Sequence, residues 1–212
     1  EMTSSLVGSE MCIRDSTISD AFLELYKAGK LTNAHKELDT GRSAWNLAMG
    51  SQALYDWLDA EPDIFHPGDL DYIHSVERIS RLSNVISING GVQLDLMGQE
   101  NAESAGTRQL SGIGGQMDFL EGAYRSKGGK GFICINSSRV TKDGERKSNI
   151  LATIPGGSTI SAPRTMIQYV ATEYGIASLS GKTLRERAEA MASIAHPDFR
   201  EELMKYAQEN FK

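Results

Sequence analysis

The sequence predicts an α/β fold, because stretches with helical spacing alternate along the chain with short apolar runs typical of strands. The 212 residues are 40% hydrophobic and 24% charged, which is ordinary for a globular protein and excludes a disordered one. Glycine accounts for 21 of them, about a tenth against a usual share of about 7%. The chain is therefore rich in the residue that allows tight turns and a close approach of backbone to ligands.

Two helices are expected in the first third of the chain. Apolar residues recur at helical spacing over 18–26, with capping residues ahead of them and Gly29 placed to end the helix. A second helix is expected over 52–58, directly after the capping residue Ser51.

The middle of the chain predicts strands. A β-hairpin is expected over 85–96, where Asn89-Gly90 separates two apolar runs and suits a turn with positive φ at both central residues. A helix is expected to follow the glycines of 112–115, and a buried strand is expected over 132–135. Further strands are expected over 150–154, 158–161 and 167–171.

The C-terminal part predicts two helices. Thr183, with Glu186 three residues on, forms a capping box ahead of an apolar helical pattern. His196-Pro197-Asp198 then breaks the chain and begins another helix, where Pro197 occupies a first helical position without losing a needed donor.

Charge and composition exclude several classes of function. With 22 Lys+Arg and 28 Asp+Glu the net charge is −6, which argues against a dedicated nucleic-acid binder. No apolar run approaches the roughly 18 residues of a membrane span. The four histidines have no metal-ligand spacing, so no metal site is expected. The two cysteines offer no disulfide framework, which favours the cytoplasm, and Cys134 in its apolar run is expected to be a buried, inert thiol.

Residues 5–16 read SLVGSEMCIRDS, which resembles the translation of a transposase sequencing adaptor over its whole length. A natural signal peptide is the alternative, but Glu10, Arg14 and Asp15 interrupt it and no basic start precedes it. We therefore expect about residues 4–17 to be foreign to the natural protein.

The glycine turn Gly112-Ile113-Gly114-Gly115 is the sharpest candidate site. Three glycines in four positions let backbone N–H groups converge on an anion or oxyanion, and a helix beginning there adds its dipole and free amides. A tight strand-to-helix turn without a ligand is the alternative. Basic residues between 127 and 147 could meet phosphate groups, although for each residue alone a solvated loop is the favoured interpretation.

Blocks of sequence from residue 18 to the end match one known family in content and order. They are the segments within 88–108, SGIGGQMDF at 111–119, SKGGK at 126–130, PRT at 163–165, TEYGIA at 172–177, LRERA at 184–188 and IAHPDFR at 194–200. Together they resemble the acetyl-CoA hydrolase/transferase family, and within it the 4-hydroxybutyrate, butyrate and acetate CoA-transferases.

This resemblance implies two linked α/β domains of the CoA-transferase fold. Residues 18–212 would form the C-terminal domain, an open sheet with flanking helices; residues 1–17 would be its interrupted start, and the N-terminal domain would be missing. Family enzymes bind no permanent cofactor and take coenzyme A as acyl-CoA substrate. A glutamate attacks the thioester, a glutamyl-CoA thioester forms through an anhydride, and a carboxylate acceptor takes the CoA. Relatives are often homo-oligomers, so the full-length enzyme is expected to be one as well. The composition, as above, predicts a cytoplasmic protein without nucleic-acid or membrane partners.

The resemblance also implies the site residues. Deleting about residues 4–17 restores Glu-Met-Thr-Ile-Ser-Asp, similar to the family pattern Thr-Glu-Met-x-Ser-Asp, so Glu1 is expected to be the nucleophile unless it is a chance truncation point. The Gly115 N–H is the expected oxyanion donor. The expected substrate and CoA contacts are Gly112, Gly114, Gln116, Asn89, His74 and Lys130.

Two other functions stay open at this point. Water could take the place of the acceptor, which would make the protein an acyl-CoA hydrolase. The chain could also be a CoA-binding or purely structural half-domain without activity of its own.

Overall fold

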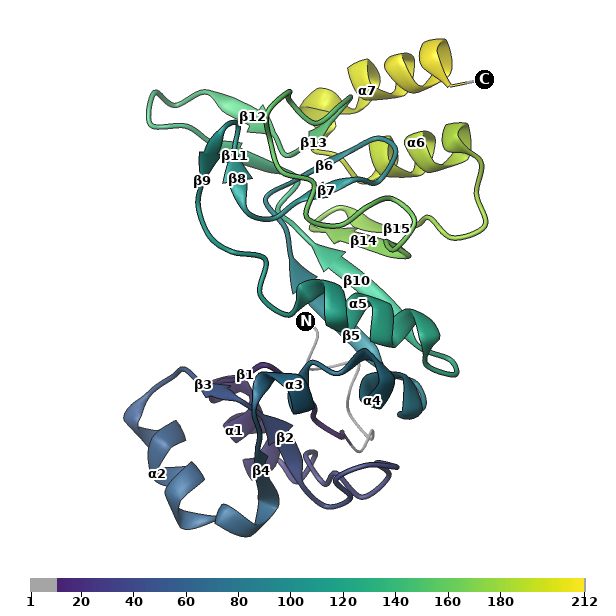
Figure 1. Ribbon diagram of the computed structural model, residues 1–212. Helices are drawn as coiled ribbons and strands as arrows, with labels where there is room; N and C mark the ends of the chain where they lie inside the picture. Colours follow the sequence, from purple (N-terminus) through teal and green to yellow (C-terminus); the bar gives the residue numbers. More distant parts are fainter. Residues whose placement is uncertain (1–10, 212) are drawn as a thin grey trace. The chain divides into compact units, whose positions relative to one another are not determined.

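The computed structural model describes residues 11–211, and the chain divides into two compact units (Figure 1). We call them unit 1 (Glu1–Ser83) and unit 2 (Asn84–Lys212). Each has a separate cluster of buried apolar side chains, so each has its own core.

Unit 1 consists of short helices and pairs of short parallel strands. The strands pair as β1 with β3 and β2 with β4. Helices α1 and α2 confirm the two expected helices, and Ser19 and Ser51 take their N-cap positions. The elements are β1 (Thr17–Ile18), α1 (Asp20–Lys27), β2 (Ser43–Trp45), β3 (Leu47–Ala48), α2 (Gln52–Ala60), the 3-10 turn η1 (Pro62–Ile64), β4 (Phe65–Pro67), α3 (Leu70–Ile73) and α4 (Val76–Arg81).

Aromatic contacts dominate the core of unit 1. The Trp57 ring lies edge-on to Phe65 at 4.8 Å between centroids and 4.9 Å from Tyr26. Leu54, one helical turn before Trp57, is fully buried in the same cluster. Helix α2 therefore supplies two central residues of the core of unit 1.

Residues 11–17, which the sequence assigns to the adaptor, are part of this unit. Met11 forms a parallel bridge with Leu31, and Ile13 is buried. Arg14 forms an ion pair with Asp39 at 3.1 Å, with both side chains almost fully buried. This segment is thus packed within unit 1, whatever its origin.

Unit 2 is built on a four-stranded sheet of order β15-β14-β10-β5, in which β5, β10 and β14 are parallel and β15 is antiparallel. A three-stranded sheet, β13-β6-β7, and two small strand pairs complete it. The strands are β5 (Ile86–Gly90), β6 (Gln93–Asp95), β7 (Glu100–Asn101), β8 (Ser104–Ala105), β9 (Arg108–Gln109), β10 (Lys130–Cys134), β11 (Ser138–Val140), β12 (Arg146–Ser148), β13 (Ile150–Leu151), β14 (Tyr169–Thr172) and β15 (Gly175–Ser178). The helices are α5 (Gln116–Arg125), α6 (Leu184–Ser193) and α7 (Pro197–Asn210).

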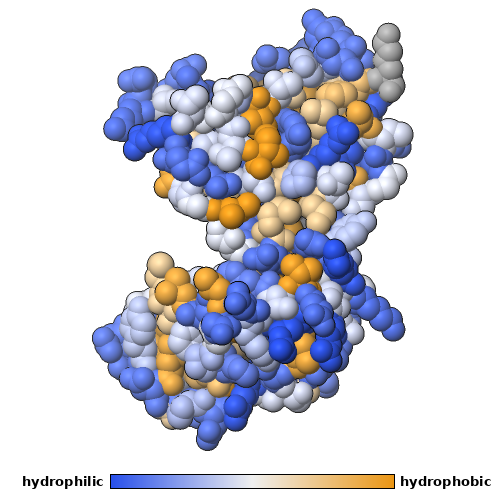
Figure 2. Space-filling model, viewed as in Figure 1, coloured by the Kyte–Doolittle hydropathy of each residue, from blue (hydrophilic) through white to orange (hydrophobic). Residues whose placement is uncertain are grey.

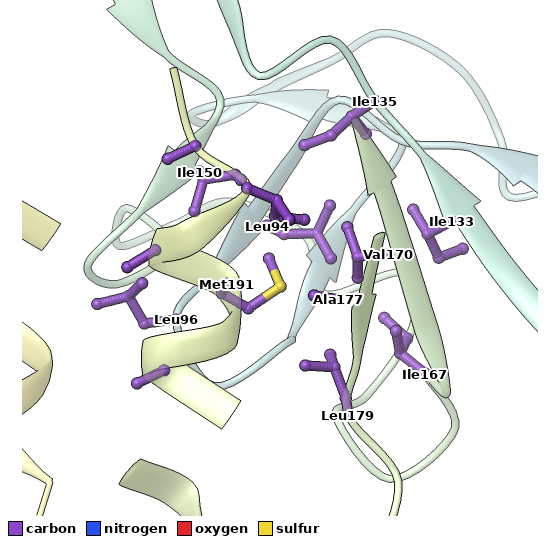
Figure 3. Packing of buried hydrophobic residues seen from close by; sticks show 14 of the residues in the cluster. Leu94, Leu96, Ile133, Ile135, Ile150, Ile167, Val170, Ala177, Leu179 and Met191 are labelled. Carbon is purple, nitrogen blue, oxygen red and sulfur yellow. The ribbon is translucent and has the colours of Figure 1, made fainter. Parts of the chain in front are cut away.

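The core of unit 2 lies between the two sheets and α6. In Figure 3, Ile133 and Val170 project from the large sheet, Leu94 from the small one, and Met191 from α6 into the same space. Alternate residues of the large sheet point the other way: Ile88 of β5 is exposed, and Phe132 of β10 and Tyr169 of β14 are partly buried. On the face displayed in Figure 2, hydrophilic residues dominate and apolar residues form small separate groups. The expected α/β class, an open sheet with flanking helices, is confirmed.

The expected hairpin over 85–96 is wrong. Asn89-Gly90 is not a turn but the end of β5, which pairs in parallel with β10. The next strand, β6, belongs to the other sheet and pairs with β7 and β13. Pairing with a distant strand outweighs the local turn preference, because the alternate apolar residues of β5 and β10 then share their faces.

Strand lengths in the second half of unit 2 also differ from expectation. The run over 150–154 forms only the two residues of β13, and 158–161 forms no strand. The run over 167–171 is shifted to β14. Both helices of the tail are confirmed, with the complete capping box at Thr183 and Glu186 and with Pro197 in the first turn of α7.

Candidate functional site

The glycine turn ends at Gly115, which is the N-cap of the ten-residue helix α5. Gly114 has a φ of +60°, a left-handed conformation that favours glycine. A Cβ added at Gly112 or Gly114 would meet no atom within 4 Å, so the turn is open rather than packed. Since the first N–H groups of a helix have no partner within the helix, this open turn suits an anionic ligand.

The turn lies near the carboxyl ends of β5 and β10. Helix α5 reaches β10 through the short 126–129 turn, and Leu120 packs against Gly131, so the helix runs back along the strand (Figure 1). At the other end of α5, Gln116 donates a hydrogen bond to Glu100, whose carboxyl lies beside Gly91. In open α/β sheets, ligands bind at this edge.

A buried carboxyl lies directly behind the turn. Glu100 is fully buried, and its Oε2 accepts a hydrogen bond from Gln116 Nε2. Its Oε1 is buried without a hydrogen-bond partner. Burial raises the pKa of Glu100 to about 8, and the neighbouring carboxylate of Glu103 acts in the same direction.

Glu103 holds the chain that leads into the turn. Its backbone oxygen accepts hydrogen bonds from Leu110 N at 2.7 Å and Ser111 N at 3.3 Å. Its side chain accepts hydrogen bonds from Ser161 Oγ at 2.7 Å and Gln109 Nε2 at 3.3 Å. The glycine turn is thus tethered at its start by Glu103 and at its end by Glu100.

Of the expected site residues, the structure brings Gly112, Gly114, Gly115 and Gln116 together in the turn. Asn89 lies near the carboxyl end of β5, close to the same edge of the sheet, and its amide donates a hydrogen bond to Ser87 Oγ at 2.7 Å.

The other expected residues lie elsewhere. Lys130 is the first residue of β10, exposed and paired with Ile86 at the amino end of the strands. His74 belongs to unit 1, where it caps the C-terminus of α3. Glu1 lies outside the described residues.

A second polar pair lies where β10 and β14 end. The buried Ser137 donates hydrogen bonds to Glu173 from its backbone N, at 2.9 Å, and from Oγ, at 2.6 Å. Although burial works to raise it, these hydrogen bonds hold the pKa of Glu173 below its usual value. Glu173 therefore acts here as a hydrogen-bonded carboxylate of the sheet edge.

The described residues also bear on three other kinds of feature: a reactive thiol, a metal site and a membrane-spanning helix. Cys134 is half-buried, and burial raises the pKa of its thiol, which disfavours a reactive thiolate. Between residues 11 and 211, no three His, Cys, Asp or Glu side chains are placed to share a metal ion. Over the same range no helix is long and apolar enough to cross a membrane.

The sequence does not predict the buried carboxyl of Glu100 or the tethering role of Glu103. Residues 98–104 are mostly polar and lack helical or alternating periodicity, so the pattern resembles an exposed loop. A glutamate in a two-residue strand becomes buried only when β6, α5 and the 161–162 segment close around it, and no local signal indicates that.

Comparison with known proteins places this architecture in a family. Residues 50–207 match the model of the acetyl-CoA hydrolase/transferase C-terminal domain. The chain is 44% identical over 189 residues to a butyryl-CoA:acetate CoA-transferase of Anaerostipes caccae, covering 89% of this chain and 42% of that protein. It is 43% identical over 199 residues to a 4-hydroxybutyrate coenzyme A transferase of Clostridium kluyveri, covering 94% of this chain and 46% of that protein.

The structure agrees with these matches. The crystal structure of RipA from Yersinia pestis superimposes with a TM-score of 0.86 at 37% identity, over 97% of this chain and 46% of that one. A protein named acetyl-CoA hydrolase, from Kluyveromyces lactis, is more distant at 30% identity over 192 residues.

An open α/β sheet that matches this model over residues 50–207 thus has the architecture of an acetyl-CoA hydrolase/transferase C-terminal domain. The chain belongs to the acetyl-CoA hydrolase/transferase family. It spans about half the length of the curated relatives it matches.

Proposed function

We propose that this chain is the C-terminal part of a CoA-transferase that moves CoA between a short-chain acyl-CoA and a carboxylate acceptor. The observation that carries the proposal is the 43–44% identity to relatives named as butyryl-CoA:acetate and 4-hydroxybutyrate CoA-transferases. The distance of the hydrolase relative, at 30%, favours transfer over hydrolysis.

The reaction would run through a glutamyl-CoA thioester. A glutamate carboxylate attacks the thioester carbonyl, which releases CoA thiolate and leaves an acyl-glutamyl anhydride. The thiolate then attacks the glutamyl carbonyl, which releases the first carboxylate and forms the glutamyl-CoA thioester. The acceptor carboxylate then attacks the glutamyl-CoA thioester, which forms a new anhydride and releases CoA thiolate. The thiolate attacks the acyl carbonyl of this anhydride, which forms the new acyl-CoA and restores the glutamate.

The glycine turn would stabilise the oxyanion that forms in each attack. What supports this role is the exposure of the turn and its place at the start of α5, where N–H groups and the helix dipole favour negative charge. Gly115 would donate its N–H to the oxyanion. Gly112, Gly114, Gln116 and Asn89 would line the same site, and His74 and Lys130 stay candidates for contacts with substrate or CoA.

Glu1 is our candidate for the nucleophile of the natural enzyme, separated from its place by the adaptor-like segment of about residues 4–17. An inserted segment at that point would ruin the alignment of nucleophile and thioester, because small misplacements cost large rate factors. We therefore expect the 212-residue chain to be inactive by itself.

The source gene and its repaired product test this assignment. Re-reading the DNA should give an uninterrupted frame in which Glu directly precedes Met-Thr-Ile-Ser-Asp. The repaired full-length enzyme, incubated with acyl-CoA and no acceptor, should carry a CoA adduct that mass spectrometry locates on that glutamate. A frame without this glutamate, or an adduct on another residue, would contradict the assignment.

The two rival functions give different results with the same material. Product that depends on the added carboxylate acceptor supports transfer, whereas free CoA released at the same rate without acceptor supports hydrolysis. Titration of the 212-residue chain with CoA tests the third function: saturable binding without any activity of the repaired enzyme would indicate a binding half-domain.

A further inference from the structure

We propose that Glu100 is a positioning residue for the glycine turn: its carboxyl holds the side chain of Gln116, the first residue of α5, and so fixes the backbone of Gly114 and Gly115. The contact itself is independent of catalysis. Only its consequence for the oxyanion rests on the proposed function.

The protein encloses the Glu100 side chain on every side. Its backbone is held in β7, where Glu100 N donates to Ala162 O at 3.0 Å and Glu100 O accepts from Ser161 N at 2.8 Å. A Cβ on Gly91 would lie 2.6 Å from Glu100 Oε1 and within 3.2 Å of Ile133 and Ile135 side-chain atoms. Oε1 of Glu100 and the side chains of both isoleucines thus converge on the space that a Cβ on Gly91 would occupy, so the carboxyl is packed beside Gly91.

No cation compensates this carboxyl among the groups that act on it. Glu103, the nearest charged group, carries the same sign and bonds to Ser161 and Gln109. Asp95 on the adjacent strand β6 accepts from Gln99 N and Nε2.

Arg187 of α6 donates to the backbone oxygens of Met97, Leu179 and Arg164 instead. A carboxyl buried without a cation is held in its neutral form, and the pKa of about 8 agrees with this geometry.

The pair is reciprocal. Gln116 is itself buried, and its amide donates to Glu100 Oε2. An apolar residue at position 100 would leave that amide without this partner, and a buried unpaired amide is costly. The Gln116 side chain would then turn to another acceptor, and the first turn of α5 would move with it, together with the glycines that precede it.

The test uses backbone amide resonances of the 212-residue chain, followed by NMR from pH 5 to 9.5. In the parent chain the amides of Gly114, Gly115 and Gln116 should shift together with a midpoint near pH 8, because ionisation of Glu100 changes its bond to Gln116. Glu100→Gln keeps an acceptor for Gln116 and cannot ionise, so its turn amides should stay near the low-pH positions of the parent and should not titrate.

Glu100→Leu removes the acceptor. Its amides at 114–116 should move away from both parent positions, and their hydrogen exchange should accelerate roughly five- to tenfold, the loss of one hydrogen bond. Glu202→Gln, which alters an exposed carboxyl of α7, is the matched control and should leave these amides unchanged.

Turn amides that do not titrate in the parent, or that titrate equally in Glu100→Gln, would overturn the proposal. If Glu100→Leu fails to fold, the comparison of the parent with Glu100→Gln still decides it. Since the readout is backbone position rather than activity, this result and the transferase assay of the repaired enzyme can fail separately.

Discussion

Glycines in unit 2 serve different physical purposes, and the structure separates them. Gly114 is required by its backbone, with φ at +60°. Gly129 is required by packing, since a Cβ there would lie 2.0 Å from the backbone oxygen of Ala123. Gly115, with φ at −86° and ψ at 8°, has a conformation that any residue can adopt. A need for glycine at position 115 would therefore come from a ligand approaching the backbone.

Gly115→Ala in the repaired enzyme should leave folding intact and lower turnover. The added methyl would crowd the thioester oxygen and lengthen its bond to the N–H, and loss of one oxyanion donor costs about 10²–10³ in kcat. Steady-state kinetics with thermal unfolding on the same sample measures both quantities. Gly114→Ala is the matched control: it should reduce stability by roughly 1 kcal/mol through its positive φ. Unchanged turnover in Gly115→Ala would contradict the oxyanion role.

Glu100 should make the stability of unit 2 depend on pH. Its folded pKa of about 8 lies above the ordinary pKa of 4.5, so the folded state binds more protons than the unfolded state between these values. The contribution of Glu100 to stability is then fully present below about pH 4.5 and is lost as pH rises towards 8. The free energy of unfolding changes by at most about 1.4 kcal/mol per pH unit in this range.

Urea titrations of the parent and of Glu100→Gln from pH 4.5 to 9 measure this effect. The free energy of unfolding of the variant should rise relative to that of the parent across this pH range. The difference should level off above pH 8. If the free energy of unfolding changed with pH in the same way for both proteins, Glu100 would ionise normally in the folded state.

At the scale of single elements, helix ends are where local chemistry decides the structure. The Oγ1 of Thr183 accepts a hydrogen bond from Glu186 N at 3.3 Å, and Glu186 Oε2 accepts one from Thr183 N at 2.7 Å. At the start of α7 a single bond has this role: His196 Nδ1 accepts from Asp198 N at 3.3 Å. These contacts involve residues two or three apart, so the sequence predicts them.

Thr183→Ala should therefore destabilise the chain by about 1 kcal/mol, the usual value of an N-cap side chain. The expected effect is confined to α6, so hydrogen exchange of its first-turn amides should accelerate more than that of α5. Thr165→Ala, at an exposed threonine without a cap role, should change neither quantity. Equal effects of the two substitutions on the urea midpoint would show that the capping box contributes nothing.

Strands and the candidate site depend on partners far away in the chain. Asn89-Gly90 has the local signature of a hairpin, yet it ends a strand because β10, some forty residues later, pairs with it in parallel. The glycine turn could be found from the sequence because its residues are consecutive. Glu100 could not be found in this way, because its burial arises from β6, α5 and the 161–162 bridge together.

Adaptor-like residues such as Ile13 are buried as native ones are, so packing alone does not reveal their origin.

At the scale of the whole chain, the two cores share no residue. The cluster around Trp57 lies entirely within unit 1, and the cluster around Met191 lies entirely within unit 2. Both tryptophans, Trp45 and Trp57, belong to unit 1. Tryptophan fluorescence therefore reports the unfolding of unit 1, while resonances of α6 and α7 report unit 2.

Cavity-forming substitutions should thus act on one unit at a time. Leu54→Ala and Met191→Ala each remove a fully buried side chain, and each should cost about 2–5 kcal/mol in its own unit. Leu54→Ala should lower the urea midpoint seen by fluorescence and leave the α6 and α7 resonances at their parent midpoint. Met191→Ala should do the reverse, because Met191 packs against Leu94 and the large sheet rather than against either tryptophan. If either substitution moved both midpoints equally, the units would unfold as one cooperative body, and the boundary at Ser83 would have no energetic meaning.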